Sequence, residues 1–360
     1  MEFNYQKLFL ALLPDLLVVV ALFAALGVDY SRMRGSRLVK RYQVACQISA
    51  AGLIAGLAVL LLQLTQAWSF TALASMTEGQ LVLTRGTLTL KALLYGMGLG
   101  VLPLAKRDQI TPQVSEYFAL LLLATLGMGF VVTSRNLLGA FVALELVSLS
   151  LYAMTVLNQA SRASAEAALK YLTFGAVASG FLLFGLSYLY GVTGQLDLTQ
   201  MTDLQHSPLL VLAYLLIFVG LGFKLALAPF HLWAPDVYQN APTPVAGWVG
   251  SGSKIAAAAL LIAMLQPVFT SPELKTELIP ALATLAVASM VVGNLGALSQ
   301  TNLKRLLAYS AIANAGYLLM GIVAQSGEGT AAILYYLAGY LFTLVAAFII
   351  IHLVTRDGEG

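Results

Sequence analysis

The sequence predicts an all-α protein, a polytopic bundle of about eleven transmembrane helices. Of its 360 residues, 59% are hydrophobic and only 10% are charged, whereas soluble domains carry about 25% charged residues. Long apolar segments recur along the whole chain, and each has the length of about 17–25 residues that crosses a bilayer. The net charge of +3 is small and gives no indication of nucleic-acid binding. A single cysteine excludes an intrachain disulfide, a four-cysteine zinc site and a cysteine-ligated iron–sulfur cluster within the chain.

Taken in order, the apolar segments define the expected helices. They lie near residues 8–27, 43–64, 88–105, 115–133, 137–157, 166–191, 208–228, 244–266, 278–298, 303–324 and 331–354. The first contains Asp15 and runs into a basic loop without a cleavage site of small residues, so we expect a retained span and not a signal peptide. The third is the weakest, because Lys91 lies near its start and Pro103 near its end. The longest loop, near 65–87 with strand-like pieces at 78–86, is too short for a soluble domain.

The distribution of basic residues between alternate loops predicts the orientation. One set of loops holds Arg32, Arg34, Arg37, Lys40, Arg41, Lys106, Arg107, Arg162, Lys304, Arg305 and Arg356. The other set holds Lys7, Arg85, Arg135 and Lys275. Because the richer side faces the cytoplasm, we expect the N-terminus outside and the C-terminus in the cytoplasm.

The stretch Gly220–Val245, GLGFKLALAPFHLWAPDVYQNAPTPV, is the most unusual part of the sequence. Lys224 lies seventeen residues into the seventh span, counted from Pro208, and Pro229 follows five residues later. A charged group beside a broken helix is unfavourable in hydrocarbon and persists only where protein or water surrounds it. A static buried ion pair is the alternative. We interpret Lys224 as a group that switches between a charged and a neutral state.

Two further spans carry charged side chains far from their ends. Glu145 lies midway through the fifth span, eight residues after Leu137, so it is hard for its carboxyl group to reach the interface. Lys254 lies in GWVGSGSKIAAAALL, whose glycines favour close helix packing or local unwinding. That stretch is not a phosphate loop, because the GK[ST] order is absent and no strand is expected before it.

Three other polar positions leave alternatives open. Lys170 opens the sixth span four residues after Glu166, so a helical ion pair near the interface competes with a functional role. His231 is either part of a polar cap on the helix break, together with Asp236, or a proton relay, since histidine titrates near neutral pH. Asp15 is either a buried partner or an interfacial turn residue. We see no metal-ligand cluster or nucleotide loop in the sequence, and alternating buried acids and bases in a membrane are typical of a proton relay.

Four stretches resemble subunit N of respiratory complex I, the proton-translocating NADH–quinone oxidoreductase. They are GFKLALAPFHLWAPDVYQNAPTPV, ALELVSLSLYAM, LKYLTFGAVASGFLLFGLSYLYGVTGQLDL and NLKRLLAYSAIANAGYLLMG. The resemblance runs from about Glu116 to the end of the sequence. The GVTGQLDL ending and the APDVYxNAPTPV string favour subunit N over its antiporter-like paralogues L and M. The multisubunit sodium–proton antiporters share the lysine and the broken helix.

The resemblance implies an antiporter-like fold with inverted repeats, each containing a discontinuous helix. It implies three N-terminal helices in 1–114, a complete first repeat in 115–266 with its broken helix at span seven, and the start of a second repeat in 267–360. The family runs to about fourteen spans, so the resemblance implies a C-terminal truncation of the second repeat. Glu145 matches the glutamate that pairs with the broken-helix lysine, Lys224, while Lys170 and Lys254 match lysines of the central hydrophilic axis.

The resulting hypothesis is a translocase subunit that moves protons through Glu145, Lys170, Lys224 and Lys254, with His231 as a possible relay. It binds no cofactor itself, and NADH, FMN, iron–sulfur clusters and quinone are implied on partner subunits. The implied location is the bacterial cell inner membrane, with a periplasmic N-terminus. The implied partners are the lipid bilayer, the antiporter-like subunit M and small subunits such as K, with no nucleic acid. The alternatives are a subunit of a sodium–proton antiporter and a non-transporting structural subunit.

Overall fold

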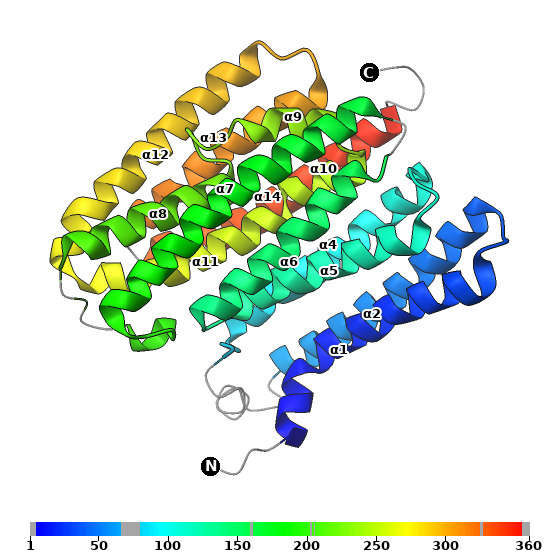
Figure 1. The fold of residues 1–360 in the computed structure, drawn as a ribbon, viewed down its shortest axis with the longest axis horizontal. Helices are drawn as coiled ribbons and strands as arrows, with labels where there is room; N and C mark the ends of the chain where they lie inside the picture. Colours follow the sequence, from blue (N-terminus) through cyan, green and yellow to red (C-terminus); the bar gives the residue numbers. More distant parts are fainter. Residues whose placement is uncertain are drawn as a thin grey trace. The chain divides into compact units, whose positions relative to one another are not determined.

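The computed structural model describes residues 5–65, 80–158, 161–201, 204, 206–324 and 327–354, and they form helices almost throughout (Figure 1). Among these residues, eleven helices are long and apolar enough to cross a membrane, which confirms the predicted number of spans. Arg356 and most of the loop at 65–87 lie outside the described residues. In the part of that loop that is described, Leu81 forms an isolated antiparallel bridge with Ser134.

The chain divides into two compact units, residues 1–160 and 161–360. The first unit contains α1 (Tyr5–Val28), η1 (Asp29–Met33), α2 (Leu38–Leu64), α4 (Arg85–Asp108), α5 (Val114–Thr133) and α6 (Leu137–Val156). Helix α5 forms the core of this unit, because it packs against α1, α2, α4 and α6 and most of its side chains are buried.

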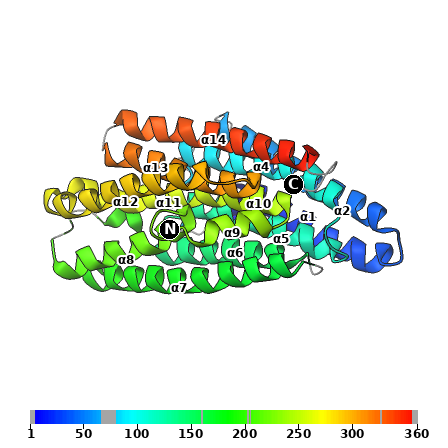
Figure 2. The same cartoon turned by 90° about the horizontal axis from the view of Figure 1, so that it is seen from above.

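The second unit contains α7 (Arg162–Thr193), η3 (Leu198–Gln200), α8 (Pro208–Leu225), α9 (Trp233–Asn240), α10 (Thr243–Gly250), α11 (Gly252–Thr270), α12 (Pro272–Leu298), α13 (Leu303–Val323) and α14 (Gly327–Val354). Figure 2 shows the α7–α8 pair and the α13–α14 pair on opposite sides of α11. Of the candidate spans in this unit, the α10–α11 segment is the most buried, because 83% of its most apolar 18-residue stretch is buried.

Polar residues at the helix starts explain where several spans begin. Asn136 and Ser207 accept hydrogen bonds from the first backbone N–H groups of α6 and α8, and Pro208 follows at the first position of α8. Thr84 forms a capping box with Thr87 at the start of α4. These groups satisfy amide donors that lack a partner within the helix. These three helices therefore begin where the sequence supplies a cap.

The outward faces of the helices are apolar. Large exposed hydrophobic side chains include Val20, Phe23, Val142, Phe184 and Leu298. A soluble monomer rarely exposes apolar patches of this extent. In a membrane these side chains contact lipid and not water, so the apolar surface agrees with a membrane-spanning bundle.

Candidate functional site

The seventh span ends earlier than the sequence predicts. Helix α8 stops at Leu225, and Ala226 has a left-handed conformation with φ 58°. The N–H of Leu227 donates to the carbonyl of Gly222 (2.8 Å), and the N–H of Ala226 donates to that of Phe223 (3.0 Å). This is the Schellman pattern that closes a helix end. Pro229 therefore follows the break and does not cause it.

Lys224 lies in the last turn of α8 and is 7% exposed. Its Nζ is 5.7 Å from the ring centroid of Phe223. The carbonyl groups at a helix C-terminus carry partial negative charge, which attracts an ammonium group. The helix break thus places the lysine beside oriented backbone dipoles and an aromatic face, inside the second unit.

One tryptophan holds the break in place. Nε1 of Trp233 donates to the carbonyl of Phe223 at 3.0 Å. Its ring is stacked on Tyr171 of α7, with centroids 4.5 Å apart and planes at 9°. Trp233 thus links α9 to α7 and to the end of α8, one residue before Lys224.

The eighth span is also interrupted. Ser251 separates α10 from α11, so the local unwinding that the glycines favoured is present. Lys254 follows in the first turn of α11, is 4% exposed, and donates from Nζ to the carbonyl of Ala311 at 2.7 Å. The unit therefore places two lysines, Lys224 and Lys254, in its interior beside interrupted helices.

Lys170 joins a network of charges around α9. Its Nζ is 2.8 Å from a carboxylate oxygen of Glu166 and 2.8 Å from one of Asp236. Arg305 of α13 donates to the other oxygen of Asp236 at 2.7 Å. The helical pair with Glu166 was an alternative from the sequence, whereas the bridge to Asp236 required the fold. Asp236 therefore fastens α9 to both α7 and α13.

Two titratable groups of the break lie outside the membrane-spanning helices. Burial opposes ionisation of Asp236, but the hydrogen bonds from Lys170 and Arg305 outweigh it and lower the pKa of this carboxyl group. Burial lowers the pKa of His231, although a hydrogen bond with the backbone of Pro229 opposes the shift. Asp236 is therefore ionised and His231 neutral at neutral pH.

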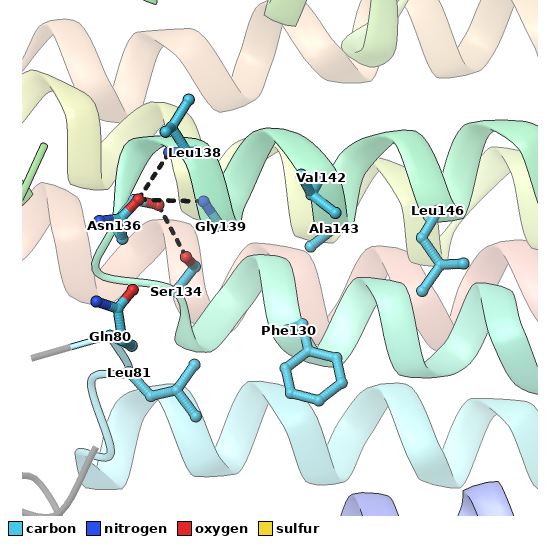
Figure 3. Close-up of a pocket in the computed structure, with 10 residues that line it drawn as sticks. All are labelled: Gln80, Leu81, Phe130, Ser134, Asn136, Leu138, Gly139, Val142, Ala143 and Leu146. Atoms are coloured by element: carbon cyan, nitrogen blue, oxygen red, sulfur yellow. Dashed lines mark hydrogen bonds between the residues drawn. The ribbon is translucent and has the colours of Figure 1, made fainter. Parts of the chain in front are cut away.

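Glu145 lies in the first unit, half-buried on α6. Beside this helix is a pocket of about 460 Å³ (Figure 3). Its polar end is formed by Gln80 and Asn136, whose Oδ1 caps α6, while Phe130 and Leu146 supply apolar walls. The residues that line the pocket include no titratable group. The pocket wall therefore contains no side chain that could carry a proton.

The first unit also contains a buried ion pair that sequence reasoning did not identify. Asp15 is 3% and Lys91 2% exposed, and their charged atoms are 2.7 Å apart. The hydroxyl of Tyr95 donates to the other oxygen of Asp15 at 2.7 Å. Gly129 lies against Lys91, where a Cβ would be 3.1 Å from Cε. Asp15 is thus a buried partner, and the span that carries Lys91 has the lowest hydropathy of the eleven candidate spans, as the sequence predicts.

Comparison with known proteins places these features in a family. The family model described as NADH:quinone oxidoreductase/Mrp antiporter, TM matches residues 134–360. NADH-quinone oxidoreductase subunit N 2 of Acidobacterium capsulatum is 41% identical over 373 residues, which cover 99% of this chain and 74% of that protein. Subunit N of Nitrosomonas europaea is 43% identical over 248 residues, which cover 68% of this chain and 51% of that protein.

Solved structures give the same result for the fold. A chain of respiratory complex I from Thermus thermophilus with bound Aureothin matches with a TM-score of 0.77 and 34% identity, over 94% of this chain and 70% of that one. A chain of the Mrp complex from a Dietzia species matches with a TM-score of 0.77 at 20% identity, over 97% of this chain and 65% of that one. The chain belongs to the subunit N family of NADH-quinone oxidoreductase, the antiporter-like membrane subunits of complex I.

Proposed function

We propose that this chain moves protons across the membrane as one subunit of an NADH–quinone oxidoreductase. Electron transfer from NADH to quinone would occur on other subunits, which carry FMN and the iron–sulfur clusters. The observation that carries the proposal is the pair of buried lysines, Lys224 and Lys254, in one unit of a membrane protein. Buried ionisable residues in membrane helices are expensive, and they mark ion pathways.

Glu145 and Lys224 are the proposed switching pair, as the family resemblance implies. When the carboxylate approaches Lys224, it stabilises the ammonium form. When it withdraws, the proton on Nζ of Lys224 passes to the neutral amine of Lys254, directly or through water. Lys224 is then neutral and can take up the next proton. Coupled electron transfer would supply the energy through the electrostatic change that moves the carboxylate.

Lys170 and His231 have supporting roles in the proposal. The bridges from Lys170 and Arg305 to Asp236 hold α9, and so the neighbourhood of the break, in place. His231 is neutral at neutral pH because burial lowers its pKa, and a neutral imidazole can accept one proton and donate another. It is the proposed relay between Lys224 and water at the break.

The wider setting follows from the family. We propose that the chain lies in the inner membrane with its N-terminus periplasmic, beside the antiporter-like subunit M and small subunits such as K. Spans four to eight, 115–266, would form one inverted repeat, and 267–360 would begin its counterpart. No cofactor is assigned to this chain.

The test is the effect of Lys224→Ala in the assembled complex. Inverted membrane vesicles report proton uptake with a pH-sensitive dye while quinone reduction is followed in the same sample. We expect quinone reduction to persist and proton uptake per electron to fall. Lys275→Ala is the matched control, because Lys275 lies near the start of α12 and is not among the proposed proton carriers. An unchanged proton-to-electron ratio in Lys224→Ala refutes the proposal.

A second candidate function has a specific observation in its favour, the family model, whose description includes the Mrp antiporter. A sodium–proton antiporter would use the same lysine and the same helix break. It predicts a sodium-dependent proton flux that needs neither NADH nor quinone. Vesicles containing the complex decide between the two candidates when the sodium gradient and the electron donor are varied separately.

A further inference from the structure

The last backbone N–H of the helix break before the proline is held by a neighbouring helix. Beyond the end of α8, the N–H groups of Ala226 and Leu227 donate back to carbonyls of α8. The next residue, Ala228, is 3% exposed, and its N–H donates to Oγ of Ser289 on α12 at 2.9 Å. Pro229 follows and has no N–H. The bond to Ser289 therefore pairs a donor that would be strongly unfavourable if it were buried without a partner.

The hydroxyl group of Ser289 is oriented as an acceptor for this bond. Ser289 is fully buried, and its hydroxyl donates to the carbonyl of Leu285, one turn earlier on α12, at 2.6 Å. Because the single hydroxyl proton is used in that bond, an oxygen lone pair faces the N–H of Ala228. The serine thus makes one bond within its own helix and one bond to the break, which lies 61 positions earlier in the chain.

Helix α12 gives this contact a firm support, because it packs closely against α13. A Cβ at Gly293, one turn after Ser289, would lie 2.4 Å from the backbone nitrogen of Ala313. A Cβ at Gly316 would lie 2.7 Å from the carbonyl oxygen of Ala286. Glycine at these two points therefore allows the backbones of the two helices to approach each other closely. The break is thus anchored to a close-packed pair of helices.

We infer that Ser289 is a positioning residue for Lys224, because it holds the segment that follows the lysine. The inference rests on the proposed function, in which Lys224 gains and loses a proton. Lys224 lies four residues before Ala228, and the path of this segment determines how the carbonyls at the end of α8 surround the ammonium group. Without the oxygen of Ser289, the segment moves until the N–H of Ala228 finds another acceptor, and the dipoles beside Lys224 move with it. Ser289 itself carries no proton in the transfer.

The first test measures the bond itself and does not depend on transport. Amide hydrogen exchange in the assembled complex is followed by mass spectrometry of peptides that contain Ala228. Ser289→Ala removes the acceptor with little change in side-chain size, and we expect the Ala228 amide to exchange about five- to tenfold faster, the factor for one lost ordinary hydrogen bond. Ser289→Thr keeps the hydroxyl and should exchange at nearly the wild-type rate. Unchanged exchange in Ser289→Ala overturns the inference.

Ser150→Ala is the matched control. Ser150 on α6 is 2% exposed, and its hydroxyl makes the same type of bond within its helix, to the carbonyl of Leu146 at 2.7 Å. Among the described residues, this hydroxyl accepts no bond from the break. Ser150→Ala therefore removes a buried hydroxyl without releasing the N–H of Ala228. It should change neither the exchange rate at Ala228 nor proton uptake per electron.

The second test measures transport in the same vesicle assay as Lys224→Ala. We expect Ser289→Ala to retain quinone reduction, while its proton uptake per electron falls toward that of Lys224→Ala, and Ser289→Thr to restore the ratio. A residue that only stabilised the fold would lower the amount of assembled complex and leave this ratio unchanged. A normal ratio in Ser289→Ala, together with fast exchange at Ala228, overturns the positioning role while the proposed function stands. If Lys224→Ala also has a normal ratio, the proposed function fails as well.

Discussion

Replacement of Trp233 tests how the broken helix is held. Trp233 is 2% exposed, and its ring lies against Tyr171 and Phe223, with ring centroids 4.5 Å and 5.1 Å away. Trp233→Phe keeps an aromatic ring in this space and removes the N–H that donates to the Phe223 carbonyl. Trp233→Ala removes the ring as well. The two substitutions separate the hydrogen bond from the packing.

The structure sets the size of each effect. The Phe223 carbonyl also accepts the N–H of Ala226 at 3.0 Å, so it stays hydrogen-bonded in Trp233→Phe. The loss is then that of an ordinary hydrogen bond, about 1 kcal/mol of unfolding free energy, plus a small term for lost volume. Trp233→Ala should lose about 3–5 kcal/mol, as buried aromatic truncations do.

Trp248→Phe is the matched control. Trp248 is fully buried on α10, and within the described part of the chain its Nε1 has no hydrogen-bond partner. The same ring change there loses volume but no hydrogen bond. Thermal unfolding of the purified complex is followed by the circular dichroism signal of its helices. The difference between each variant and wild type gives the three shifts in unfolding temperature. We expect the largest loss in Trp233→Ala, then Trp233→Phe, then Trp248→Phe. A shift in Trp248→Phe equal to or larger than that in Trp233→Phe refutes the role of the hydrogen bond.

Three further predictions concern stability, measured in the same way. Ala226→Gly should stabilise the protein, because a residue with a Cβ in the left-handed region costs about 1 kcal/mol, and Ala226→Val should destabilise it; the reverse order contradicts the assigned helix end. Asp15→Asn should lose about 3–5 kcal/mol, because it leaves Lys91 charged and buried, whereas adding Lys91→Met should recover most of that loss; additive losses contradict a direct pair. The pKa values of Asp236 and His231 are both lowered in the folded chain, so the stability that each group contributes is complete above its ordinary pKa of 3.8 or 6.5 and is lost as the pH falls below that value. His231→Gln should flatten the loss of stability that begins below pH 6.5, and an unchanged stability profile refutes this.

The sequence was sufficient for the fold class and the number of candidate spans. Eleven apolar segments became eleven candidate spans, because segment length and hydrophobicity leave few alternatives in a membrane. The broken helix at Lys224 was also predictable. Its end was not, because Pro229 is the evident breaker in the sequence, while the helix ends at Leu225 with an alanine in the left-handed conformation. Only backbone coordinates reveal that hydrogen-bond pattern.

The ion pairs mark the limit of sequence reasoning. The Glu166–Lys170 pair could be read from helical spacing, since its members are four residues apart. The bridges from Lys170 and Arg305 to Asp236 span more than sixty positions, and the Asp15–Lys91 pair spans 76. Nothing in local spacing identifies such partners. A rule that a buried charge in a membrane requires a buried counter-charge would have made Lys91, in the third span, a candidate partner for Asp15 in the first.

The central claim is that Glu145 controls the proton on Lys224. The most direct measurement is the proton-to-electron ratio of the assembled complex with Glu145→Gln, compared with Glu145→Asp in the same vesicles. The account predicts that Glu145→Gln retains quinone reduction but moves fewer protons per electron, while Glu145→Asp keeps the charge and preserves most of the ratio. A normal ratio in Glu145→Gln, with the complex fully assembled, would contradict the account and would favour a structural role for the chain.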